Sequence, residues 1–288
     1  MSQIQGYIQG KTVSWFHRNL ARGNSHCLYC SRPVTVDSNR EHVIARNFVP
    51  AGAFGVNDFN FLFRACRRCN SSKADDERHV SSITLVNTPA RAENQLADEA
   101  AVRKANRDYH PDKPGTKIVD SCEDIKVVLK RSPRMSISMG FSSPPQVNLD
   151  CVRRLALRQI QALFSLVTTD DIRMPRLLPP ASFRFFKCYS ANDWGNPQLK
   201  ELVNRVEDWR SHVNIVTADG FFRALLSRDE NSVNGEWFWA LEWNKYLRVI
   251  GGLAKMNKPH PQVFDKLPLL AGTRREIPFS DDYQLFPS

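Results

Sequence analysis

The sequence has few features of a membrane or secreted protein. No apolar run approaches the roughly 18 residues that a membrane-spanning helix needs. The opening segment, MSQIQGYIQGKTVSW, contains no apolar stretch followed by small residues, so we expect no signal peptide. We also find no internal repeat and no low-complexity segment. We therefore expect a cytoplasmic globular protein that has no association with membranes.

Acidic residues are outnumbered by basic ones. The 288 residues include 40 lysines and arginines against 30 aspartates and glutamates, which gives a formal net charge of +10. Residues 1–80 contain 11 basic and 6 acidic residues, so this segment carries +5, half of the excess. A basic surface favours polyanions such as nucleic acids, although many basic proteins bind none. Charge alone leaves nucleic-acid binding as one interpretation among several.

Cysteines are too few and too unevenly spaced for a disulfide framework. Three of the seven, Cys122, Cys151 and Cys188, stand alone, and we expect them to be small apolar core residues. The other four form CLYC at 27–30 and CRRC at 66–69. Two such pairs predict a zinc ion bound by four thiolates, from Cys27, Cys30, Cys66 and Cys69. Because four protein ligands fill the tetrahedral shell of zinc, we expect this ion to stabilise the fold rather than to catalyse.

Polar residues between and just after the cysteine pairs predict a second site. Glu41 and His42 are adjacent within the zinc loop, in NREHVIARN. Asn60 lies six residues before the second cysteine pair, and Asn70 follows that pair directly. In order, spacing and residue type, residues 24–80 resemble the HNH nuclease family, whose active site is a ββα-metal motif. The resemblance covers a little over a fifth of the chain.

The resemblance implies a role for each matching residue. His42 would be the general base that activates water, and Asn60 would orient His42 and brace its loop. Glu41 and Asn70 would bind a catalytic divalent cation, Mg²⁺ or a similar ion, because hard cations prefer oxygen ligands. Three basic residues beside the site would grip the nucleic-acid backbone, namely Arg67, Arg68 and Lys73.

Other interpretations of these residues stay open. An isolated histidine is more often a core or surface residue, and Asn60 or Asn70 could be a turn or capping residue. The family usually has proline three residues after the histidine, and this chain has Ala45. Adjacent strand residues point to opposite faces, so Glu41 and His42 can share one ligand only if the backbone bends there.

The remainder of the chain carries no motif that we connect with a function. HPDKPGT at 110–116 ends an expected helix at 90–108, so we divide the chain into domains at 1–115 and 116–288. We expect further strands at 125–130 and 135–141 and in SFRFFKCYS, HVNIVTAD, FFRALLS, EWFWALEW and YLRVIGGL, and helices at 150–167 and in PQLKELVNRVEDW. This order predicts an α+β fold: an N-terminal zinc-stapled ββα-metal domain, then an α+β domain with a largely antiparallel sheet.

The sequence thus favours a metal-dependent HNH-type endonuclease that cuts DNA, with RNA left open, and a C-terminal domain that targets or regulates it. The first alternative is a non-catalytic, zinc-stapled nucleic-acid-binding module. The second is an interaction protein that uses zinc only for folding. The acid–histidine pair together with both asparagines favours the enzyme, because a binding module needs basic residues but not this set. A homodimer, and a regulatory ligand or protein at the C-terminal domain, also stay open.

Overall fold

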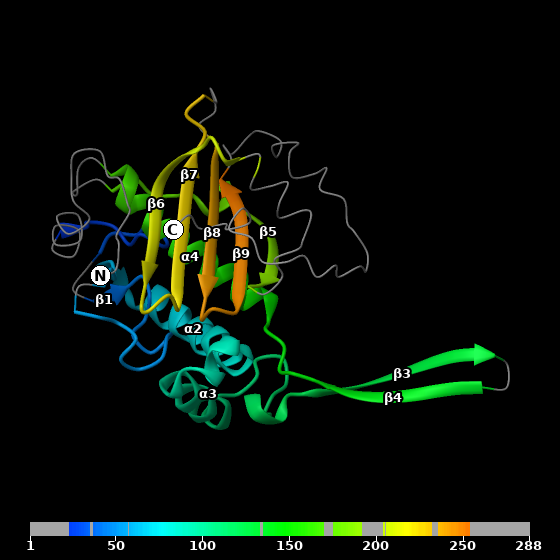
Figure 1. Ribbon diagram of the computed structural model, residues 1–288. Helices are drawn as coiled ribbons and strands as arrows, with labels where there is room; N and C mark the ends of the chain where they lie inside the picture. Colours follow the sequence, from blue (N-terminus) through cyan, green and yellow to red (C-terminus); the bar gives the residue numbers. More distant parts are fainter. Residues whose placement is uncertain are drawn as a thin grey trace.

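The chain folds as a mixed α+β protein with antiparallel sheets (Figure 1), which confirms the predicted fold class at this level. The computed structural model describes residues 23–34, 37–56, 58–132, 135–169, 175–191, 204, 206–231 and 236–253. Within those ranges, no helix is both long and apolar enough to cross a membrane. The helix predicted in PQLKELVNRVEDW falls mostly outside the described residues.

Two short strands and a long helix form the N-terminal part. Strand β1 (Ser38–His42) pairs antiparallel with β2 (Leu62–Cys66). Helix α2 (Arg67–Asn87) begins directly after β2, with Cys66 at the N-cap position. The order of these elements therefore places the second cysteine pair at the junction of β2 and α2, with Asn70 directly after it in α2.

The helix predicted at 90–108 forms in two pieces. The first is the short helix η1 (Pro89–Ala92), and the second is α3 (Gln95–Arg107). The side chain of Asn94 caps α3 by accepting a hydrogen bond from the N–H of Ala97. A further short helix, η2 (Ile118–Asp120), leads into the next strands.

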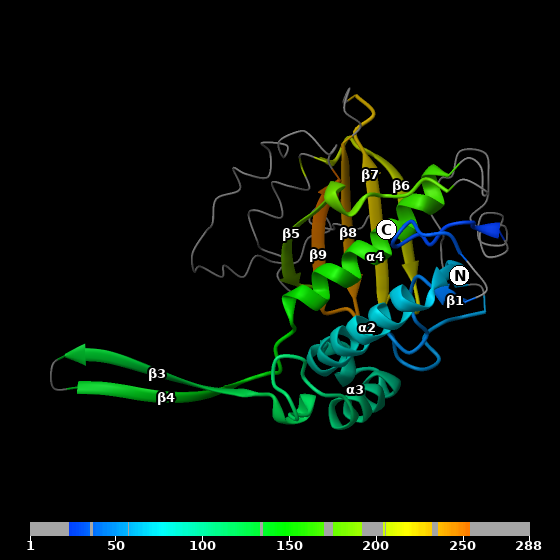
Figure 2. The same ribbon diagram turned by 180° about the vertical axis from the view of Figure 1, so that it is seen from behind.

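A five-stranded antiparallel sheet with one long helix across it forms the C-terminal part. The strand order is β5-β9-β8-β7-β6. The strands are β5 (Phe183–Ser190), β6 (Arg210–Thr217), β7 (Phe222–Arg228), β8 (Trp237–Trp243) and β9 (Leu247–Leu253). Helix α4 (Leu149–Thr168) lies across one face of this sheet (Figure 2), and η3 (Pro180–Ser182) precedes β5. All five strands and the helix at 150–167 were predicted from the sequence.

A hairpin projects from this body. Strands β3 (Glu123–Ser132) and β4 (Met135–Ser143) pair antiparallel and extend well beyond the other described elements (Figures 1 and 2). Both strands were predicted. Their separation from the body was not, because alternation along a strand does not say what covers it.

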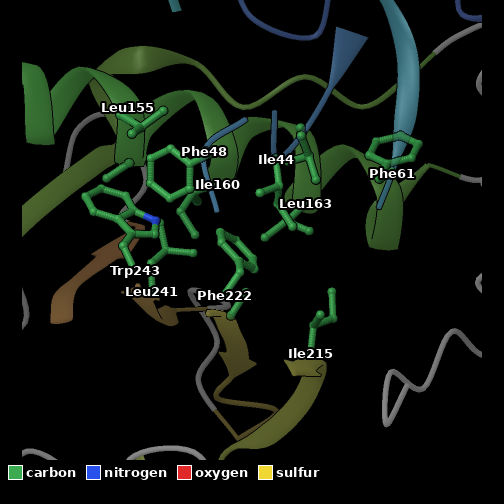
Figure 3. Packing of buried hydrophobic residues seen from close by; sticks show 14 of the residues in the cluster. Ile44, Phe48, Phe61, Leu155, Ile160, Leu163, Ile215, Phe222, Leu241 and Trp243 are labelled. Atoms are coloured by element: carbon green, nitrogen blue, oxygen red, sulfur yellow. The ribbon is translucent and has the colours of Figure 1, made fainter. Parts of the chain in front are cut away.

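The apolar core runs across the predicted domain boundary. Ile44 and Phe48 from the loop after β1 pack with Ile160 of α4 and Trp243 of β8 in one cluster (Figure 3). The rings of Phe48 and Trp243 meet edge to face, with their centroids 6.0 Å apart. Residues on both sides of position 115 therefore share one core, and the loop that carries the predicted site is fixed against the sheet.

Ion pairs join the same two parts. Asp76 of α2 is buried, and its carboxylate binds Arg154 at 2.7 Å and Arg158 at 2.9 Å, both from α4. Removing one partner of a buried pair leaves an uncompensated charge, which is strongly destabilising. These contacts fix the position of α2, and with it Asn70, relative to α4.

Candidate metal centre and active-site cleft

Four cysteines from the two CxxC pairs come together. Their Sγ atoms all lie within 4.8 Å of one another, in a group made of Cys27, Cys30, Cys66 and Cys69. The Sγ atoms of Cys30 and Cys66 are 3.7 Å apart. In a tetrahedral site with Zn–S bonds of about 2.3 Å, neighbouring sulfurs lie about 3.8 Å apart. The cluster can therefore hold a metal such as zinc, as the sequence predicted.

Three thiols of this cluster have shifted pKa values, and the shifts differ in direction. The pKa of the Cys27 thiol is lowered to about 4, chiefly because the Cys69 thiol donates a hydrogen bond to it, with further help from backbone N–H groups. The pKa of the Cys69 thiol is raised, because losing its proton would break that bond. Burial raises the pKa of the Cys30 thiol. A bound cation would take the place of the hydrogen bonds between these sulfurs.

His42 and Glu41 lie on one cleft. His42 is the last residue of β1, and the chain bends at residues 43–44. Both residues are paired within β1, opposite Phe63 and Leu62, so the bend follows them and does not lie at the pair itself, where a shared ligand would require one. Both residues line a cleft of about 370 Å³, and Asn70 of α2 lines it as well. The predicted base and both predicted metal ligands therefore face one space.

Basic residues surround this cleft. Its lining includes Arg40, Arg46, Arg78, Lys104 and Arg107. The arginines among them are exposed, whereas Lys104 is buried and donates hydrogen bonds to the carbonyl oxygen of Asn47 and the hydroxyl of Ser81. Burial lowers the pKa of Lys104 to about 8. Arg67 and Arg68 are exposed at the start of α2, where a polyanion could reach them.

A second hollow lies on the other side of His42. It measures about 760 Å³, and its walls include Asn60, Arg103 and the loop around Pro50 and Phe54. His42, Arg46 and Asn47 line both hollows. His42 therefore stands at the junction of two adjoining hollows rather than at the end of one.

The position of Lys73 differs from the one predicted for it. Its side chain is fully buried, with Nζ 2.6 Å from Oε1 of Glu41 and 2.6 Å from Oε1 of Glu77. It also donates to the carbonyl oxygen of His42 at 3.0 Å. The prediction that Lys73 contacts a phosphate is wrong in this structure, because two carboxylates hold its ammonium group inside the protein.

Glu77 completes this arrangement, and we did not predict it. Its Oε1 accepts the N–H of Ala45 at 3.1 Å as well as the ammonium of Lys73, and its side chain lines the cleft. Proline, the usual family residue at the position of Ala45, has no N–H to donate. The one sequence feature that could have pointed to Glu77 is its spacing of four residues from Lys73, which suits a helical ion pair.

The carboxyl group of Glu41 is buried and partly neutralised. Both Lys73 and the hydroxyl of Tyr29, the latter at 3.3 Å, contact its Oε1. Burial raises the pKa of the Glu41 carboxyl, and the nearby ammonium of Lys73 opposes that rise. Glu41 and Glu77 thus bring two carboxyl groups and the ammonium of Lys73 together beside the cleft.

The two asparagines have different positions. Asn60 braces the loop after His42, since its Oδ1 accepts the N–H of Ile44 at 3.3 Å and its Nδ2 donates to the carbonyl of Ile44 at 2.8 Å. Both bonds hold the loop at Ile44, and the roles predicted for Asn60 toward His42 stay predictions. Asn70 is not the cap of α2, because Cys66 occupies the N-cap position.

Comparison with known proteins identifies no relative. No family model matches this chain, and neither a curated protein nor a solved structure matches it. The residues of the cleft and the resemblance of residues 24–80 to the HNH motif are therefore the only guides to a function.

Proposed function

We propose that this chain is a metal-dependent endonuclease of the HNH type that hydrolyses phosphodiester bonds in DNA. The observation that carries the proposal is the cleft on which His42, Glu41 and Asn70 meet within a basic rim. The order β1, β2, α2 beside a four-cysteine cluster supports it too, because the resemblance implies two strands and a helix around the site.

The oxygen donors of the cleft fit a hard divalent cation. The contacts of Glu41 with Lys73 and Tyr29 both use Oε1, so Oε2 is the oxygen that a cation would take. Asn70 would supply its amide oxygen. Two protein ligands suit Mg²⁺, which keeps several waters and is often held by few carboxylates together with substrate phosphates. A cation bound there would stabilise the negative charge that develops on the scissile phosphate.

His42 would accept the proton of the attacking water. The water oxygen forms a bond to phosphorus, the bond from phosphorus to the leaving oxygen breaks, and that oxygen takes a proton from solvent. Several contacts fix the backbone around His42: Lys73 donates to its carbonyl oxygen, and Asn60 holds Ile44. Positioning of this kind counts because small displacements of a catalytic group cost large factors in rate.

The basic rim would hold the substrate. Arginine binds phosphate oxygens through paired N–H groups, and exposed arginines line the cleft that contains His42. The two hollows that meet at His42 give a strand room on either side of the scissile phosphate. A binding module would use the same arginines, but it would have no use for a histidine, an acid and an amide on one cleft.

Incubation of the purified chain with supercoiled plasmid tests the proposal. With Mg²⁺ or Mn²⁺ we expect nicked or linear product, and with EDTA we expect none. Salt-sensitive binding of the plasmid without cleavage in any of these cations would contradict the proposal and favour the non-catalytic binding module.

A further inference from the structure

The projecting hairpin of β3 and β4, called the arm below, is a two-stranded ribbon without a third strand among the described residues. Strands of this length extend roughly 30 Å, close to one turn of B-DNA at about 34 Å. An ion pair of 2.9 Å between Lys113 and Glu123 holds its base. An isolated two-stranded hairpin is marginally stable in water, so a ribbon this long points to a partner that covers it.

The outer part of the arm is basic, whereas the acidic residues of its first strand lie at the base. Residues 125–141 contain two lysines and two arginines and no acidic residue. The acids of β3, Glu123 and Asp124, are both at the base. The outer arm is therefore complementary to a polyanion and unsuited to a basic surface.

One set of alternating positions along the arm includes a lysine, a serine and a glycine as well as one valine. Exposed Lys126 lies opposite Gly140, and Val128 lies opposite Ser138. Residues without bulky side chains let a ribbon approach the floor of a groove closely. Serine hydroxyls and lysine ammonium groups are donors to phosphate oxygens and base edges.

The other set of positions is apolar and supports the ribbon itself. Val127 lies opposite Met139, while Leu129 and Phe141 on the same face are 51% and 52% exposed. Cross-strand pairs of this kind stabilise a hairpin. As a contact between two copies, this face is small: about 17 Å by 10 Å, or roughly 170 Å², against the roughly 800 Å² per partner of a stable complex. A second copy therefore explains the arm less well than a polyanion does.

We propose that the arm docks in the major groove of duplex DNA, with the face of Lys126 and Ser138 toward the bases. The major groove of B-DNA is about 12 Å wide and admits a two-stranded ribbon, whereas that of double-stranded RNA is too narrow. The inference deepens the proposed function and takes its substrate class, DNA, from it. It adds a binding surface separate from the cleft that contains His42.

Binding of a labelled 30-base-pair duplex to the full chain, in KCl series without divalent cations, tests the arm. The His42→Ala variant serves as the parent, so that cleavage does not interfere. In that background the neutral triple variant K126Q/K130Q/R131Q should bind at least tenfold more weakly. The slope of log affinity against log salt concentration should also be shallower for the triple variant than for the parent, by up to about 3. Each lost phosphate contact accounts for roughly 0.9 of that difference. The charge-preserving triple K126R/K130R/R131K should retain the affinity of the parent.

The other outcomes either overturn the inference about the arm or bear on the nuclease proposal alone. Unchanged affinity and slope in the neutral triple, or equal loss on double-stranded RNA of the same sequence, would overturn it. A third result would also overturn it: the parent runs as a dimer in size-exclusion chromatography, and V127S/M139S dissociates that dimer without loss of DNA binding. The arm would then be a self-association surface. If the wild-type chain cuts nothing while DNA binding still depends on the arm, the nuclease proposal fails and the arm stands.

Discussion

The backbone N–H of Ala45 donates to Oε1 of Glu77 at 3.1 Å, three residues after the proposed catalytic histidine. The same carboxylate binds Lys73, whose ammonium donates to the carbonyl oxygen of His42. Glu77 thus holds the backbone of the histidine segment at two points. A proline in place of Ala45 has no N–H and would remove the direct bond to Glu77, leaving only the contact through Lys73.

We expect Ala45→Pro to destabilise the chain by about 1 to 3 kcal/mol, because it removes a hydrogen bond to a charged, buried acceptor. Urea unfolding measures the difference. Ala45→Gly is the matched control, since it shortens the side chain and keeps the N–H. A proline variant no less stable than the glycine variant would show that the bond to Glu77 contributes nothing.

Lys73→Met should be strongly destabilising. The variant leaves Glu41 and Glu77 buried without the ammonium group that both contact, and breaking a buried ion pair costs about 3 to 5 kcal/mol. Lys117→Met, at an exposed lysine, is the control in the same unfolding assay. Equal, small losses for both variants would mean that the buried triad is not formed in solution.

The stability difference between Glu41→Gln and wild type should depend on pH. Burial raises the folded-state pKa of the Glu41 carboxyl above its ordinary value of 4.5. Stability from the protonated carboxyl is therefore present below pH 4.5 and lost as the pH rises through the folded-state pKa. Glutamine does not ionise, so the stability of the variant relative to wild type should increase as the pH rises through the folded-state pKa of Glu41. Unfolding at several pH values, with exposed Glu99→Gln as control, measures it, and a flat or falling difference contradicts it.

Cys66→Ser should lose bound metal, while Cys122→Ser should keep it. Cys66 belongs to the four-thiol cluster, whereas Cys122 lies outside it and is exposed, contrary to the core position expected from the sequence. Structural zinc sites contribute folding free energy of about 10 to 16 kcal/mol in small domains, so we expect the first variant to unfold around residues 24–80. Metal content and the thiolate absorption of the cobalt-substituted chain provide the measurement. One zinc per chain in Cys66→Ser would remove Cys66 from the site.

Much of the fold could be predicted because apolar periodicity marks it. Helix α4 has buried apolar residues at helical spacing, and β8 and β9 are short apolar runs bounded by turn residues. The four-cysteine cluster could be predicted because the CxxC spacing follows from the geometry of zinc. In both cases local sequence reports directly on what the residues contact.

The polar interior of α2 could not be predicted in the same way. Before Val80, this helix buries Lys73, Asp76, Glu77 and His79, so that part of its buried face shows no apolar stripe. Its partners are distant in sequence: Glu41 for Lys73, and Arg154 for Asp76. Only tertiary contacts reveal these two pairs, which is why Lys73 was predicted to contact phosphate; the spacing of Lys73 and Glu77 within α2 was a local signal that we overlooked.

The rate of cleavage of a labelled duplex by wild type and by His42→Ala, with chain in excess and Mg²⁺ present, tests the central claim most directly. We predict a fall of about 10²-fold or more in the variant, with zinc content and duplex binding retained, because a general base typically contributes a factor of about 10² to 10⁴ in rate. His212→Gln, a histidine of β6 that pairs with Glu230 at 3.0 Å, is the control and should cleave as wild type. Equal rates for wild type and His42→Ala would contradict the account and place the chemistry outside this cleft.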